Sequence, residues 1–86
     1  MNNITKAQLK HVIRPVTYAL LLAIPQGLNT IELSYYLNST PGIKKYKPTE
    51  EKIRSILKSY IPKGNSVFIQ RGDTWFIRDL VGGYIV

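Results

Sequence analysis

The side chains with the clearest chemical potential in this chain of 86 residues are cationic, and most lie in its middle third. Residues 41–64 hold seven lysines and arginines against Glu50 and Glu51, a net charge of +5, whereas residues 1–40 carry +2 and residues 65–86 balance at zero. Ammonium and guanidinium groups bind phosphate and carboxylate oxygens strongly. The net charge of the chain is +7, and most of it lies in residues 41–64. This concentration favours a polyanionic partner and a localised binding surface.

Residues suited to catalysis or metal binding are scarce. The chain has no cysteine, and its one histidine, His11, has no nearby acidic residue in the sequence with which to form a catalytic set. A structural zinc site needs four ligands, mostly cysteine or histidine, and a disulfide framework needs cysteines. No phosphate-binding glycine loop, dinucleotide fingerprint or hydrolase nucleophile motif occurs. We therefore expect no enzymatic activity, no metal and no cofactor, and a surface or structural role for His11.

An apolar run at residues 16–24 follows Lys6, Lys10 and Arg14, which resembles the start of a secretion signal. The run is far shorter than the roughly 20 residues that span a bilayer, and no small-residue cleavage site follows it. We therefore predict that this run forms a buried core helix and that the protein does not associate with a membrane. We expect a cytoplasmic protein that, because of its positive charge, is associated with nucleic acid.

Turn and cap residues divide the first half of the chain. Pro15 has no backbone donor and disfavours a helical Arg14, so a break or kink is predicted there. It would separate an N-terminal extension or helix, residues 1–14, from a core at 15–78. We expect residues 15–24 to form a helix that is buried nearly all round. A short helix at 31–38, capped by Asn29 or Thr30, would follow, and then a turn and a basic connection up to residue 48.

The strongest helical pattern lies at residues 49–60. Apolar side chains recur there at helical spacing, and they are Ile53, Ile56, Leu57 and Tyr60. Thr49 is the predicted N-cap, and Glu50 and Glu51 fall in the first turn, where carboxylates suit the helix dipole.

Beyond residue 66 the pattern becomes that of strands. Segments 67–70 and 74–77 are rich in β-branched and aromatic residues, and a turn sequence at 71–73 separates them, so a β-hairpin is predicted. Of two possible loops, we favour one of three residues, because it would place Val67, Ile69, Trp75 and Ile77 on one buried face. The apolar tail, residues 79–86, is expected to add a strand, cover the core or contact another subunit.

The order of these elements resembles that of the winged helix-turn-helix superfamily. The resemblance covers about residues 15–78, and four segments carry it: 16–24, 31–37, 49–60 and 67–77. It implies a single α+β domain over residues 1–86, in which a three-helix core is followed by a β-hairpin wing.

The resemblance also implies binding of double-stranded DNA, with helix 49–60 in the major groove and the hairpin on the backbone or in the minor groove. Around that helix, Arg54, Ser55 and Lys58 face away from the apolar stripe and could reach bases or phosphates. Lys44, Lys45 and Lys47 precede it and are expected to anchor phosphates, as is Arg71 at the wing tip. The candidate DNA-binding residues are Lys44, Lys45, Lys47, Thr49, Lys52, Arg54, Ser55, Lys58, Lys63 and Arg71.

Three alternatives to DNA binding stay open. Glu51 lies on the same face and would repel phosphate, so the charges could also be an ordinary solvated face. The leading hypothesis is a small transcription regulator that dimerises or binds a protein through residues 1–13 or 80–86. The alternative is a protein-interaction module of the same fold that binds and modulates a nucleic-acid enzyme or polymerase. Binding of double-stranded RNA ranks lower, because no RNA motif is visible.

Overall fold

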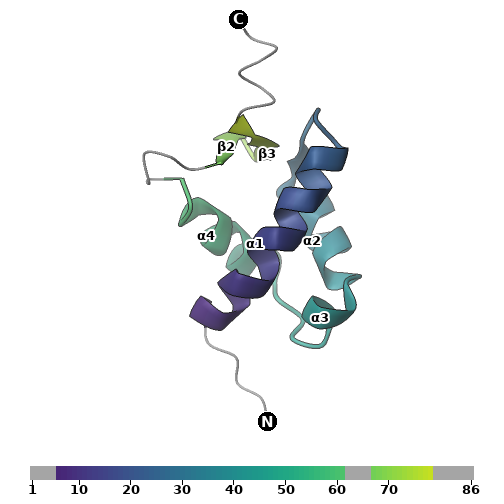
Figure 1. The fold of residues 1–86 in the computed structure, drawn as a ribbon. Helices are drawn as coiled ribbons and strands as arrows, with labels where there is room; N and C mark the ends of the chain where they lie inside the picture. The colour runs from purple at the N-terminus through teal and green to yellow at the C-terminus, as the bar shows by residue number, and fades with distance from the viewer. Residues whose placement is uncertain (1–5, 62–66, 79–86) are drawn as a thin grey trace, which may run out of the picture.

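The structure is a computed structural model that describes residues 6–61 and 67–78. These residues form an α+β domain in which helices pack on one another and on a small antiparallel sheet (Figure 1). The elements are α1 (Lys6–Ala23), β1 (Leu28–Asn29), α2 (Thr30–Asn38), α3 (Pro41–Lys44), α4 (Glu50–Lys58), β2 (Phe68–Arg71) and β3 (Thr74–Ile77). The predictions for Lys63 and for the tail at 79–86 lie outside the described residues.

Helix α1 continues through Pro15, so the helix is not broken at Arg14, and the core begins before residue 15. Leu9 and Ile13, before the proline, are buried in the same core as later residues of the helix. Pro15 leaves the carbonyl of His11 without its helical partner, but both residues are exposed, so water can solvate that carbonyl. Burial of one uninterrupted helix face outweighs the cost of the proline.

The second half of α1 is buried on one side only, which corrects the expectation of burial nearly all round. Thr17 and Leu21 are fully buried, whereas Tyr18 and Leu22 are 40% and 44% exposed. The helix contacts α2, α3, α4 and β3 along its inner side, and its outer side is left uncovered by the described residues (Figure 1). None of the helices described here is long and apolar enough to cross a membrane.

Helix α2 begins where the sequence predicts. Asn29 is its N-cap: its side-chain Oδ1 accepts from the Glu32 backbone N–H at 2.8 Å, and the Glu32 carboxylate accepts from the Asn29 N–H at 2.9 Å. This reciprocal pair satisfies two donors at the helix start. The single turn of α3 was not predicted. Pro41 opens it, a position that needs no backbone donor, and Ile43 is buried.

Helix α4 confirms the strongest sequence pattern. Thr49 caps it by accepting from the Lys52 N–H at 3.1 Å. Ile53, Ile56 and Leu57 are fully buried, and Tyr60, two residues beyond the helix end, is 7% exposed. The apolar stripe therefore docks α4 on the core and turns its opposite face outward.

The β2–β3 hairpin has a loop of two residues, not the favoured three. Arg71 pairs with Thr74 and Phe68 with Ile77, so Phe68, Trp75 and Ile77 face the core and Ile69 does not. Val67, just before β2, is half-buried against the core. Gly72 has a φ of +64°, whereas Asp73 does not have a positive φ, which is the pattern of a type II′ turn. Glycine at the first turn position tolerates that conformation, and the two-residue loop follows from it.

Strand β1 adds a third strand that was not predicted, and the sheet order is β1-β3-β2. Leu28 pairs with Trp75, and Asn29 with Thr74. Gly27, just before the strand, has a φ of +89°, and a Cβ there would lie 2.6 Å from the Phe76 ring and 2.8 Å from the Trp75 carbonyl. Two residues show no periodicity, so the strand has no sequence signal apart from this glycine.

Candidate nucleic-acid interface

The outward face of α4 is open to solvent. At 100° per residue, Glu51, Ser55 and Lys58 lie opposite the buried stripe, with Lys52 and Arg54 on the two flanks. All except Arg54 are exposed, and Arg54 is partly buried. The predicted orientation of this helix is therefore confirmed, including the acidic side chain at its centre.

Three further lysines lie on the segment that leads into α4. Lys44 ends α3, Lys45 is its C-cap and Lys47 lies in the connection, and all three are exposed. Lys45 Nζ lies 5.2 Å from the centre of the Tyr46 ring, which attracts the cation. We call the following residues the basic surface: Lys44, Lys45, Lys47, Lys52 and Lys58. None of these lysines forms an ion pair with a carboxylate of the described residues.

The connection that carries these lysines is held in one conformation. Asn38, at the end of α2, donates from Nδ2 to the carbonyls of Ser34 at 2.9 Å and Pro48 at 3.1 Å. Lys47 has a φ of +49°, a left-handed conformation that is unfavourable for a side chain with a Cβ. Pro48 is buried beside it. These contacts fix the path of the backbone from α3 into α4.

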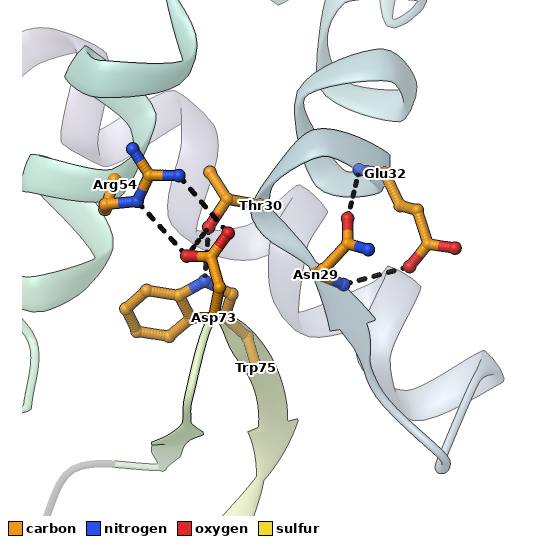
Figure 2. A network of polar contacts seen from close by, with 6 residues as sticks. All are labelled: Asn29, Thr30, Glu32, Arg54, Asp73 and Trp75. Atoms are coloured by element: carbon orange, nitrogen blue, oxygen red, sulfur yellow. Dashed lines mark hydrogen bonds and ion pairs between the residues drawn. The ribbon is translucent and has the colours of Figure 1, made fainter.

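A polar network ties the hairpin turn to α2 and α4 (Figure 2). The hydroxyl of Thr30 accepts from Trp75 Nε1 at 2.9 Å and donates to Asp73 Oδ1 at 2.7 Å. The Thr30 N–H also donates to the Asp73 carbonyl at 3.1 Å. Thr30 and Trp75 are fully buried. One buried threonine therefore satisfies the tryptophan donor and positions the turn.

Arg54 completes this network from α4. Its Nε donates to Asp73 Oδ1 at 3.1 Å, and its Nη2 donates to Asp73 Oδ2 at 3.2 Å (Figure 2). These bonds, and then the bond from Thr30, hold the pKa of the Asp73 carboxyl below its usual range. The same carboxylate raises the pKa of Arg54. Arg54 is thus engaged within the protein, in contrast to the expected contact with base edges.

Three predicted site residues remain: Arg71, Thr49 and Lys63. Arg71 is exposed at the end of β2, two residues from Asp73, so it lies at the hairpin turn as expected. Thr49 is exposed, but its side-chain oxygen already caps α4. Lys63 lies outside the described residues.

Sequence reasoning missed two features. A buried tryptophan needs a hydrogen-bond acceptor, but nothing in the pattern identified Thr30, which is 45 residues away in the chain. Lys10 and Arg14 were weighed only as flanks of a signal-like run, yet both lie over the Tyr60 ring at 5.7 Å from its centre. The first feature fixes the hairpin turn, and the second creates another cationic region on α1.

No protein-family model, curated protein or solved structure matches this chain. Within residues 6–61 and 67–78, no group of three or more histidine, aspartate or glutamate side chains is placed to hold a metal ion.

Proposed function

We propose that this chain is a winged-helix domain that binds double-stranded DNA through the basic surface. The observation that carries the proposal is the exposure of five lysines on α3, its connection and α4, none of them paired with a described carboxylate. Exposed ammonium groups on a docked helix and the segment before it suit contacts to phosphate. The pairing of β1 with β3 and the β2–β3 hairpin after α4 also suit this fold.

In this proposal α4 enters the major groove with Ser55 and Lys58 toward the bases. Lys44, Lys45 and Lys47 bind phosphates on the flanking backbone, and Arg71 adds a contact from the hairpin turn. Arg54 serves as a positioning residue, because its two bonds to Asp73 fix the hairpin turn against α4. The hairpin turn is held close to α2 and α4, so its share of the contacts is small.

The test is titration of a fluorescent mixed-sequence DNA duplex, followed by anisotropy, with two matched variants. K44Q/K45Q and K10Q/R14Q each remove two positive charges, but only the first pair belongs to the basic surface. We expect K44Q/K45Q to weaken binding by at least about tenfold at low salt and K10Q/R14Q to change it little. Equal losses would show that net charge alone drives binding, and absence of binding by wild-type protein at micromolar concentration would refute the proposal.

A protein-interaction module of the same fold is the second candidate. Five large apolar side chains are exposed among the described residues: Tyr18, Leu22, Ile31, Tyr35 and Tyr36. Aromatic residues are enriched at protein interfaces, and a nucleic-acid enzyme or polymerase is the partner class suggested by the basic surface. In that case the duplex titration fails while a protein partner still binds.

A further inference from the structure

A groove between α1 and the start of β2 is separate from the basic surface. One part, of about 430 Å³, lies against Pro15 and Tyr18 of α1 and Phe68 of β2. A smaller part, of about 200 Å³, lies beside Lys10 and Tyr60. His11 and Arg14 line both parts, so the two lie side by side; we call them together the α1–β2 groove. The larger part is within the range of about 300–1,000 Å³ that is usual for ligand pockets.

One end of this groove is cationic. Lys10 and Arg14 supply the positive charges from α1, and His11 lines the groove beside them. The Arg14 guanidinium carbon lies 5.7 Å from the centre of the Tyr60 ring and 5.9 Å from that of Phe68. These aromatic faces attract the cation and favour its position at the groove. None of the described lining residues is acidic, so no carboxylate among them neutralises these cations.

The other end is apolar, and Tyr60 adds no negative charge to the cationic end. The Tyr60 hydroxyl donates to the Lys10 carbonyl at 3.2 Å, and burial raises the pKa of Tyr60 to about 12. The phenol is therefore neutral at physiological pH. Pro15 and Tyr18 are both exposed, and they border the part of the groove nearest to Phe68. The groove thus places a positive end next to an apolar end.

We propose that the α1–β2 groove binds an acidic segment of a partner polypeptide that also carries a large apolar side chain. A carboxylate of the segment pairs with Arg14 and Lys10, and the apolar side chain enters the part beside Tyr18 and Phe68. The adjacency of the two parts requires both groups close together in the partner. A regular DNA duplex supplies the anion, but its bases are stacked and leave the apolar part unfilled. This inference does not depend on DNA binding, because the groove and the basic surface share no residue.

The test uses the full isotope-labelled chain and three short synthetic peptides as probes, followed by amide chemical shifts. One peptide alternates glutamate with leucine, the second contains glutamate alone, and the third alternates lysine with leucine. We expect saturable shifts at Tyr18 and Val67 with the first peptide only. No saturable shift, or an equal response to the glutamate-only peptide, would overturn the proposal.

Variants then locate the site. R14Q is expected to weaken binding of the glutamate–leucine peptide by at least about tenfold, since a charged hydrogen bond is lost. Y18S should weaken it similarly through the apolar part, and it tests the proposal independently if R14Q disturbs the packing on Tyr60. K45Q is the matched control, which should leave peptide binding unchanged and weaken DNA binding. Displacement of the peptide by duplex DNA, or insensitivity to both R14Q and Y18S, would overturn the proposal whatever the result with DNA.

Discussion

The replacement Thr30→Val tests whether one buried hydroxyl holds the hairpin in place. Valine has nearly the shape of threonine, so packing is retained while two hydrogen bonds of the hydroxyl are lost. The bond to Asp73 is partly exposed, and water can replace it at little cost. The bond from Trp75 Nε1 is buried, and an unsatisfied buried donor costs about 1–3 kcal/mol. We therefore expect T30V to lower the free energy of unfolding by about 1–3 kcal/mol.

A double-mutant cycle separates this cause from a general loss of packing. W75F removes the indole N–H, so T30V should cost much less in the W75F background than in the wild type. Urea unfolding followed by far-UV circular dichroism measures both steps, because W75F removes the only tryptophan and with it the fluorescence signal. An equal cost of T30V in both backgrounds would refute the assignment of the hydroxyl to Trp75.

Four further predictions concern single residues. Gly27→Ala should destabilise the domain by about 2–4 kcal/mol in urea unfolding, because its Cβ would strain the positive-φ backbone and clash with the Phe76 ring. An unchanged unfolding midpoint would contradict this packing. Thr17→Val should raise the melting temperature, since the buried Thr17 hydroxyl has no partner among the described residues; a clear decrease would indicate a hidden partner. The pKa of Asp73 is lowered in the folded protein, so its carboxylate contributes stability that is present above about pH 4 and lost as the pH falls through the folded pKa. D73N should therefore reduce the acid-induced drop in the urea midpoint. An identical drop in D73N and wild-type protein would contradict the pairing of Asp73 with Arg54. Glu51→Gln should strengthen DNA binding more than Glu50→Gln. Both variants lose a first-turn carboxylate, but only Glu51 lies at the centre of the outward face of α4. Equal effects of the two variants would show that this face does not contact DNA.

Local patterns in the sequence predicted the elements whose cause is local. The stripe of Ile53, Ile56 and Leu57 and the Thr49 cap define α4, and the caps of α2 and α4 follow from side-chain chemistry within three residues. The exposure of Lys52 and Lys58 also follows, because a helix that buries one stripe must present its other side to solvent.

Features that depend on distant partners could not be predicted in this way. The continuous α1 arises because Ile13 and Leu21 share one core, which local proline rules do not include. Strand β1 exists because β3 supplies its partner, and the Arg54–Asp73 pair depends on where the hairpin turn falls. The loop length was the one local error, since Gly72 at the first turn position already indicated a two-residue loop.

Contact between the basic surface and the DNA backbone is measured by the salt dependence of duplex affinity. Each phosphate contact contributes a slope of about −0.9 to the plot of log affinity against log salt concentration. We predict that the variant K44Q/K45Q/K47Q makes the slope shallower by about 2.7 relative to wild-type protein. A wild-type slope near zero, or a slope that this variant leaves unchanged, would show that these lysines do not bind DNA phosphates.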